Sequence, residues 1–253
     1  MNKLLERLAP IAFGIIALSL WQAAVTLGSV PSYVVPGPID IWHAYLDSYT
    51  ILNPTLLSTL TVTFAALAVA TAVGVALAVA MAASTLFRAA VQPWAVTLQV
   101  TPIVAIAPLI ILWVPQPFIA LVVCAAIIAF FPILSNTAAG LAATPQDLQD
   151  LFRLNGASRW QILFLLRLPS ALPNFLTGLR ISGTLALVGA VVAEFVAGSG
   201  GFASGLAYRI IEASYRLQIP RMFAALIMLG ISGIFIYSVL GLLERFLLRS
   251  RDA

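Results

Sequence analysis

The sequence predicts an all-α membrane protein with about six transmembrane helices. Hydrophobic residues make up 62% of the 253 residues and charged residues only 9%. Apolar stretches recur that are roughly 20 residues long, the length a helix needs to cross the hydrocarbon core of a bilayer. The charges gather at the edges of these stretches. A water-soluble domain needs more polar surface, so the composition excludes that class.

The first two predicted spans cover residues 9–27 and 56–83. Lys3 and Arg7 precede the first span, and the alternative to a membrane helix there is a cleaved signal peptide. Because the apolar stretch is longer than a usual signal core and further spans follow, we expect an uncleaved helix. The second span is uncharged and rich in small residues, including Gly74. It is therefore expected to pack closely against its neighbours.

The third and fourth spans are predicted at 91–113 and 118–140. No charged residue occurs from Ala89 to Gln146, which is too long for one crossing, and Pro115 and Pro117 supply the break. Two further prolines at positions 102 and 108 either kink the third span toward a transport path or only shape its packing. The sequence leaves both interpretations open.

The fifth and sixth spans are predicted at 174–197 and 222–243. The fifth has Arg180 near its start and Glu194 near its end, whereas the sixth is uncharged. Arg180 is expected to extend to the membrane interface rather than to bind an anion. The single cysteine, Cys124, lies within an apolar run, so neither an intrachain disulfide nor a Cys-rich metal site is expected.

The basic residues predict the orientation of these spans. Six crossings place both termini on one side, and loops rich in Lys or Arg tend to remain cytoplasmic. The inside group comprises Lys3, Arg7, Arg88, the arginines from 153 to 180, Arg245, Arg249 and Arg251, and the outside group comprises Arg209, Arg216 and Arg221. Both termini and the loop at 144–169 are thus expected in the cytoplasm. The charges are read as topology determinants, and no nucleic acid partner is expected.

The loop at 144–169 contains a charged island between two apolar spans. Thr144 as a polar cap and Pro145 at the first helical position are typical of a helix start, Asp147 and Asp150 suit its first turns, and Gly156 predicts a turn before a second short helix. Pro169 and Pro173 are expected to end this element before the next crossing. The prediction is a helix-turn-helix lying across a membrane surface. The alternative is a solvated loop whose basic residues only fix topology.

The spacing of residues in this island resembles the EAA motif of ABC importer permeases. The matching positions are Asp150, Gly156, Leu166, Leu168 and Pro169, whereas Leu151 and Phe152 replace the two alanines of the motif and Asp150 its glutamate. Two further segments are similar to the nitrate, sulfonate and taurine branch of these permeases. They are PSALPNFLTGLRISGTLALVGAVVAEFVAGSGG and the upstream VTPIVAIAPLIILW. The resemblance covers about residues 36–244.

This resemblance implies a type I importer permease that pairs with a second copy in a bacterial inner membrane. Each copy would insert cytoplasmic coupling helices into one of two ATP-binding subunits, which would use ATP and Mg, while this chain binds no cofactor or metal. A periplasmic substrate-binding protein would contact the loops at 30–54 and 199–220. The residues expected to couple the chain to the ATPase are Asp150, Arg153, Gly156, Ala157, Ser158, Arg159, Leu168 and Pro169. No Walker A pattern occurs, and Lys3 is the only lysine.

A transport path or gate is expected near the end of the fifth span. Glu194 is an acidic residue at membrane depth, which marks a functional candidate. It either bonds the backbone at 198–201 as a structural latch or gate, or contacts solute directly. Gly198 and Gly200 belong to a glycine-rich stretch that either gates the path or forms an ordinary loop. Gln99 either lines the path or bonds a neighbouring helix.

Two other classes of function fit the sequence less well. An intramembrane hydrolase needs a nucleophile with a base in reach, but His43 is the sole histidine and lies outside the predicted spans, so no catalytic residue is assigned. A stand-alone secondary transporter or channel is the main alternative, although neither a repeat nor many charges within the spans support it. The expected solute is a sulfonate, taurine or nitrate-like anion, or a vitamin or pyrimidine precursor.

Overall fold

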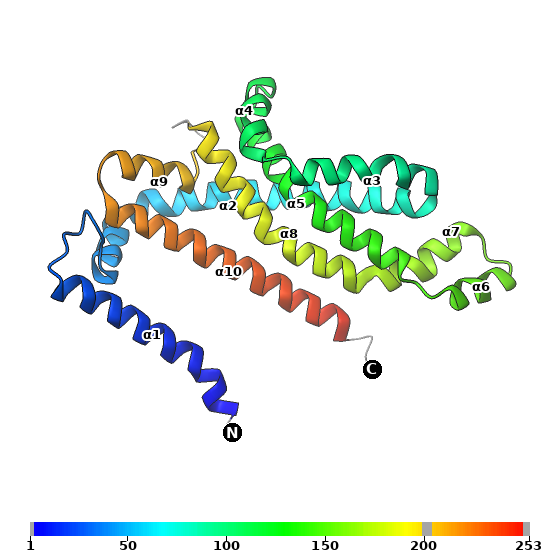
Figure 1. Cartoon of the computed structure of the whole chain (residues 1–253), viewed down its shortest axis with the longest axis horizontal. Coiled ribbons are helices and arrows are strands. Elements are labelled where there is room, and N and C mark those ends of the chain that lie inside the picture. Colours follow the sequence, from blue (N-terminus) through cyan, green and yellow to red (C-terminus); the bar gives the residue numbers. More distant parts are fainter. Residues whose placement is uncertain (1–2, 199–203, 250–253) are drawn as a thin grey trace.

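The computed structural model describes residues 3–198 and 204–249, and their regular structure is entirely helical. Figure 1 shows an elongated bundle. Its elements are α1 (Lys3–Leu27), α2 (Pro38–Ala83), α3 (Thr85–Val100), α4 (Ile103–Trp113), α5 (Pro117–Ala142), α6 (Gln146–Leu154), α7 (Arg159–Gln161), the π-helix η1 (Ile162–Arg167), α8 (Leu168–Ala197), α9 (Leu206–Tyr215) and α10 (Ile219–Arg249).

The prediction of an all-α membrane protein is confirmed. Five helical segments are long and apolar enough to cross a membrane, and the α3–α4 pair would supply a sixth span if its two bent parts are counted as one. Only helices or closed barrels satisfy their backbone hydrogen bonds in hydrocarbon, which accounts for the absence of strands in the described part.

The third predicted span is broken rather than straight. The axes of α3 and α4 differ by 101° across the break at Thr101 and Pro102. Pro102 disfavours a helical conformation at the preceding residue, and Thr101 is extended, with φ −78° and ψ 123°. Pro108 lies inside α4 without ending it. The sequence left open whether Pro102 and Pro108 kink the third span. The structure shows that the bend is at Pro102. The predicted break before the next span is also present, since α5 begins at Pro117.

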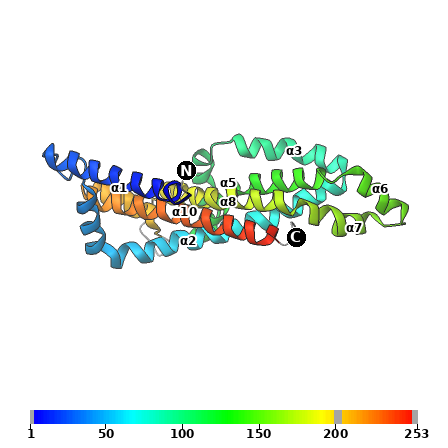
Figure 2. The ribbon, with the colours of Figure 1, turned by 90° about the horizontal axis from the view of Figure 1, so that it is seen from below.

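The helix that contains the second predicted span begins at Pro38, eighteen residues earlier than expected. Residues 38–54 are therefore helical, and the expectation of a loop there was wrong. Proline suits the first position of a helix, and the N–H of Gly37 donates to the Asp40 carboxylate at 3.1 Å, which closes the first turn. Figures 1 and 2 show that α2 changes direction in its first third, where Pro54 lies inside the helix.

The centre of the bundle is a close antiparallel pairing of α5 and α8. Three glycines face the opposite helix of this pair, Gly140 on α5 and Gly178 and Gly189 on α8. A Cβ atom added at any of them would overlap or crowd that helix, at Ala171, Pro132 and Ala125 respectively. The hydroxyl of Ser182 donates to the Ala129 carbonyl oxygen at 2.6 Å. Small residues allow membrane helices to approach closely and gain dispersion contacts.

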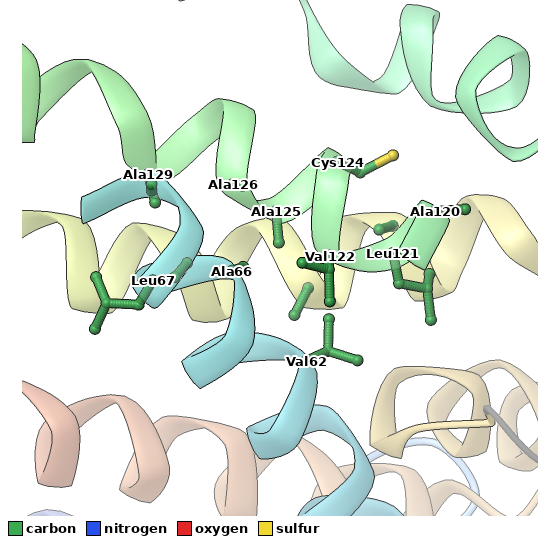
Figure 3. Close-up of a cluster of buried hydrophobic side chains, with 14 of the residues drawn as sticks. Val62, Ala66, Leu67, Ala120, Leu121, Val122, Cys124, Ala125, Ala126 and Ala129 are labelled. Atoms are coloured by element: carbon green, nitrogen blue, oxygen red, sulfur yellow. The ribbon is translucent and has the colours of Figure 1, made fainter. Parts of the chain in front are cut away.

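The α5–α8 pair is completed by one face of α2. Val62, Ala66 and Leu67 of α2 join the buried residues of α5, which include Leu121 and Ala125, in one apolar cluster (Figure 3). By contrast, the span of α1 over residues 8–27 has no residue buried against the rest of the chain. Figure 1 shows the first part of α1 lying apart from the bundle, whereas the ring of Trp21 near its end lies 6.3 Å, centre to centre, from the Phe223 ring of α10.

The pairing of α5 and α8 gives the bundle two distinct ends. The connection between these helices, residues 146–167, projects at one end and is called the hairpin here (Figure 1). The start of α5, the end of α8 and the short helix α9 lie at the opposite end, called the α9 end.

Replacing Gly189 by alanine tests the close approach of α5 and α8. Its added Cβ would lie 2.8 Å from the Ala125 Cα atom, whereas Gly230 on α10 has nothing within 4 Å. We expect Gly189→Ala to lower the free energy of unfolding by about 1–3 kcal/mol. Gly230→Ala, the matched control, should leave it unchanged or slightly raised. Thermal unfolding in detergent measures both, and equal melting temperatures for the two variants would contradict the close approach.

Candidate coupling hairpin and the Glu194 cluster

The first helix of the hairpin starts slightly later than the sequence predicted. Helix α6 begins at Gln146, and Thr144 does not cap it, because its hydroxyl lies 3.5 Å from the Leu141 carbonyl oxygen in the last turn of α5. The side chain of Gln149 donates to the Thr144 carbonyl oxygen at 3.0 Å and ties α6 back to this turn. The predicted cap at Thr144 was therefore wrong.

The predicted turn at Gly156 is confirmed. Its φ of +75° lies in the left-handed region that favours glycine. The N–H of Gly156 donates to the Arg153 carbonyl oxygen at 2.9 Å, and that of Ala157 donates to the Phe152 carbonyl oxygen at 3.0 Å. A Cβ at this position would meet nothing within 4 Å. Glycine is thus required by the backbone conformation and not by lack of space.

The second helix of the hairpin is capped by Ser158. Its hydroxyl accepts from the Gln161 N–H at 3.3 Å, and the Gln161 side chain accepts from the Ser158 N–H at 2.7 Å. This reciprocal pair is a capping box, which fixes where the chain becomes helical again after the turn.

The helix that follows runs without a break from Arg159 to Ala197. The expectation that Pro169 and Pro173 end the element was therefore wrong. The π-helix at 162–167 shifts the hydrogen-bond pairing directly before Pro169, and Pro173 lies one turn further on. Such a local shift accommodates a missing N–H group without ending the helix. Leu168 and Pro169 are half-buried, and Leu168 packs against the core at the base of the hairpin.

Most charged side chains of the hairpin are exposed, whereas Arg167 at its base is half-buried. Asp150 and Arg153 form an ion pair of 2.8 Å within α6, with both side chains more than 60% exposed. Arg159 forms no ion pair within residues 3–198 and 204–249. Exposed pairs contribute little stability. These groups are therefore available to another molecule.

Arg167 joins the hairpin to the ends of two bundle helices. Its guanidinium donates to the Leu141 carbonyl oxygen from Nε at 3.1 Å and from Nη2 at 3.0 Å, and to the Ala82 carbonyl oxygen from Nη1 at 3.2 Å. These carbonyls lie in the last turns of α5 and α2, where helices leave acceptors without partners and carry partial negative charge. From the sequence, Arg167 was interpreted only as a positive charge that sets the membrane orientation. Its carbonyl partners could not be predicted, because they are 26 and 85 residues away along the chain.

Glu194 lies at the α9 end and is 3% exposed. Its Oε2 atom accepts hydrogen bonds from the Thr59 hydroxyl at 3.1 Å and from the Ala207 N–H at 3.0 Å. The Thr59 hydroxyl oxygen in turn accepts from the Leu206 N–H at 2.8 Å. Thr59, Glu194, Leu206 and Ala207 are called the Glu194 cluster here. It joins α2 and α8 to the first turn of α9.

The Glu194 cluster provides α9 with the cap that its own sequence lacks. Gly205 precedes α9 and offers no side-chain acceptor to the free N–H groups of the first turn. The distant Thr59 and Glu194 supply these acceptors instead, and the carboxylate suits the positive end of the helix dipole. A Cβ at Gly205 would overlap the Glu194 carboxylate. Glycine here permits the contact.

The other predicted path residues do not join this cluster. Gly198 has φ +55° and ends α8, and its N–H donates to the main-chain oxygen of Glu194 at 3.2 Å. The sequence predicted a bond between the Glu194 side chain and the backbone at 198–201. Of these residues the structure describes only Gly198, which does not bond the Glu194 carboxylate. Gly200 lies outside the described residues. Gln99 is exposed on α3, and its side chain bonds no described residue.

Arg180 does not extend freely to the interface as predicted. Its guanidinium lies 3.3 Å from the Glu244 carboxylate of α10 and 3.9 Å from the centre of the Tyr237 ring. The Thr177 hydroxyl donates to the other Glu244 oxygen at 3.1 Å. Gly241 leaves room for the guanidinium. Ion pairing and stacking on an aromatic ring therefore hold Arg180 between α8 and α10.

The charged residues of α9 largely satisfy one another. Glu212 lies 2.7 Å from Arg209 and 2.9 Å from Arg216. The hydrogen bond from Arg209 is the main cause that lowers the pKa of the Glu212 carboxyl below its usual value.

His43, the sole histidine of the sequence, is exposed on α2. The described residues contain no group of three or more His, Cys, Asp or Glu side chains that could hold a metal ion.

The sequence of this chain is similar to those of known transport proteins. A family model described as binding-protein-dependent transport system inner membrane component matches residues 70–249. The riboflavin transport system permease protein of Chloroflexus aurantiacus is 41% identical over 236 residues, which cover 92% of this chain and 86% of that protein. A Bacillus subtilis protein provisionally named as an aliphatic sulfonates transport permease is 31% identical over 242 residues, covering 94% and 86%.

The fold is shared with a solved structure. The crystal structure of an amino acid ABC transporter with histidines aligns with a TM-score of 0.64 and 22% sequence identity. The alignment covers 79% of this chain and 96% of that chain. The helical arrangement described above is therefore one that a known transporter adopts.

Removing the Thr59 hydroxyl tests the Glu194 cluster. Thr59→Val keeps the shape of the side chain but leaves the Leu206 N–H without its acceptor and removes a donor to Glu194. We expect the start of α9 to lose about 1–3 kcal/mol of local stability, so that its amides exchange faster with deuterium. Thr61→Val is the matched control, because that hydroxyl bonds only the Leu57 carbonyl oxygen. Unchanged exchange over residues 206–215 in Thr59→Val would contradict the cap.

Removing the guanidinium of Arg167 tests the junction at the hairpin end. Arg167→Met keeps an apolar stem but leaves the Leu141 and Ala82 carbonyls without this donor. We expect a loss of about 2–3 kcal/mol in the free energy of unfolding. Thermal unfolding in detergent checks this, with Arg245→Met, an exposed arginine on α10, as the control. Indistinguishable melting temperatures would show that Arg167 does not join the hairpin to the bundle.

Proposed function

Because the chain belongs to the family of binding-protein-dependent transport system inner membrane components, the permeases of ABC transporters, we propose that it is the permease subunit of an ATP-driven importer. In this proposal it forms the path for a small solute, and a separate subunit hydrolyses ATP with Mg. The observation that carries the proposal is the hairpin, an exposed helix-turn-helix placed directly between the two central helices α5 and α8.

The ATP-binding subunit docks on the tip of the hairpin in this proposal. Its contacts include the exposed groups Asp150, Arg153, Gly156, Ser158 and Arg159 together with the half-exposed Ala157. Leu154 is 86% exposed and adds apolar surface beside them. An apolar anchor surrounded by charged groups is typical of a protein interface. Leu168 and Pro169 are assigned to the base of this coupling surface, where Leu168 packs against the core.

The hairpin end faces the cytoplasm of a bacterial inner membrane in this proposal, and both termini lie on that side. The start of α3 and the end of α10 lie toward this end (Figure 1), and Arg88, Arg245 and Arg249 belong to these helix ends, while Arg167 ends the hairpin. Loops with such residues tend to stay inside. The complete importer contains two permease copies and two ATP-binding subunits. The uncovered span of α1 leaves an apolar face for lipid or for the second copy.

The solute path operates by alternating access in this proposal, and the α9 end forms its outer gate. The Glu194 cluster holds α9 to α2 and α8, so breaking or remaking its three hydrogen bonds would open or close that end. Gly198, with φ +55°, allows the chain to turn at the end of α8. Gly200 is assigned to the gate and Gln99 to the wall of the path from the sequence alone. A periplasmic binding protein would deliver solute to α9 and to the first turns of α2.

A second role for Glu194 is direct contact with solute. A cavity of about 130 Å³ lies beside it, with Ser204 and Tyr208 in its wall. The Oε1 atom of Glu194 is buried and accepts no hydrogen bond from the described residues. A solute that carries hydrogen-bond donors could bond this oxygen.

The solute is proposed to be a small organic molecule of the vitamin-precursor kind. The 41% identity to a riboflavin permease supports this choice. A sulfonate, taurine or nitrate-like anion is the alternative, supported by the 31% identity to the Bacillus subtilis protein. Ligand screening of the binding protein encoded near this chain distinguishes them, because selectivity in such importers would lie largely in that protein.

The Gly156→Val variant tests the coupling role of the hairpin. The chain is purified from native membranes in mild detergent with the subunits that accompany it, and ATP hydrolysis and uptake are measured after reconstitution. Valine is strained at φ +75°, so we expect solute-stimulated hydrolysis and uptake to fall at least about tenfold. Gly230→Val is the matched control, since that glycine also has open space but an ordinary φ.

Two outcomes would overturn the proposed function. Unchanged stimulated hydrolysis and uptake in Gly156→Val would remove the coupling role from the hairpin. Recovery of the chain without an ATP-binding subunit, together with uptake into vesicles that contain no ATP, would instead support a stand-alone secondary transporter or channel.

A further inference from the structure

The cavity of about 130 Å³ at the α9 end is bounded by α4, α5, α8 and α9, and Glu194 forms part of its wall. The other polar side chains in the wall are those of Ser204 and Tyr208, whose hydroxyl groups bond no described residue. The rest of the wall is mainly apolar and includes Leu121 and Ala197. A mainly apolar cavity with a few polar groups is the usual character of a site for a small molecule.

One oxygen of the Glu194 carboxyl group has no hydrogen-bond donor among the described residues. Glu194 is 3% exposed, and its Oε2 atom accepts from Thr59 and Ala207. Its Oε1 atom is equally buried and accepts no hydrogen bond from the described part of the chain. A buried acceptor without a donor costs free energy. A molecule in the cavity that donates a hydrogen bond to Oε1 would remove this cost.

The surroundings of the cavity disfavour an anion. Its described wall contains no Arg, Lys or His side chain, and the sequence has no charged residue from 195 to 208. The N–H groups of Leu206 and Ala207 at the start of α9 already bond the Glu194 cluster, so they are not available to an anion. An anion buried beside an acidic side chain without a cation is strongly unfavourable. A sulfonate or nitrate group therefore does not suit this cavity.

The volume of the cavity sets the size of the group that fits. An apolar cavity of about 150 Å³ is enough to bind benzene. The cavity beside Glu194, of about 130 Å³, is therefore suited to one six-membered ring. A solute with several fused rings would place only one of them here.

We propose that this cavity admits a six-membered nitrogen heterocycle whose amino group donates a hydrogen bond to Glu194 Oε1, and that it rejects anions. The hydroxyl groups of Ser204 and Tyr208 would bond the ring nitrogen atoms. This inference rests on the proposed function, because it makes the outer gate of the importer selective. It favours the vitamin or pyrimidine precursors over the sulfonate and nitrate-like anions.

Ligand-detected NMR tests this site without ATP and without a binding protein. The full chain is purified in mild detergent with the subunits that accompany it, and the probes are 4-aminopyrimidine, pyrimidine and methanesulfonate. We expect 4-aminopyrimidine to bind roughly tenfold more tightly than pyrimidine, the effect of one hydrogen bond to a charged group. Methanesulfonate should not bind.

Two variants place the probe at Glu194. Glu194→Gln keeps an acceptor for Thr59 and Ala207 but presents an N–H group to the cavity, so the preference for 4-aminopyrimidine should disappear. Asp47→Asn is the matched control, an exposed acid on α2 outside the cavity wall, and should bind as the wild type does. Ala197→Leu fills the cavity without removing a bond of Glu194 and should abolish binding. Deuterium exchange of residues 206–215 checks that α9 keeps its place.

The outcomes distinguish this inference from the proposed function. Equal affinity for 4-aminopyrimidine and pyrimidine, no binding of either, or binding of methanesulfonate would overturn the selective cavity in the wild-type chain alone. An unchanged preference in Glu194→Gln would also overturn it. None of these results depends on ATP hydrolysis, whereas the proposed function fails when the chain is recovered without an ATP-binding subunit and transports without ATP.

Discussion

The structure depends first on the close contact between α5 and α8. In hydrocarbon, apolar side chains gain little by moving from lipid to protein, so helix association relies on packing and on interhelical hydrogen bonds. Glycines on both helices remove the side chains that would separate the backbones. Ser182 adds a hydrogen bond to a carbonyl of the opposite helix. With this pair fixed, α2 completes the core and the remaining helices arrange around it.

The same pairing makes α8 a rigid connection between the two candidate functional regions. The hairpin is the link between α5 and α8, and Glu194 lies near the other end of α8, a helix of 30 residues that is about 45 Å long. At the hairpin end Arg167 holds the ends of α2 and α5, and further along α8 Arg180 holds α10 through Glu244. These ties are partly buried within the protein, where satisfied polar contacts are costly to break.

The sequence predicted features that depend on local chemistry. Span lengths follow from hydropathy, and the turn at Gly156 follows from the conformational freedom of glycine. Features that depend on distant contacts were missed. The hydroxyl of Thr59 and the carboxylate of Glu194 are 135 residues apart, and the carbonyl partners of Arg167 are up to 85 residues away. Pro169 was expected to end a helix, but a π-helical turn accommodates it, and the early start of α2 depends on Pro38 and Asp40.

Hydrogen exchange on the reconstituted complex, with and without ATP, tests most directly the proposal that ATP acts at the hairpin and that the Glu194 cluster opens and closes the outer gate. We predict that ATP changes deuterium uptake in residues 146–158 and also in residues 206–215, and that Gly156→Val abolishes both changes. A change confined to the hairpin, with α9 unaffected by ATP in the wild-type complex, would contradict it.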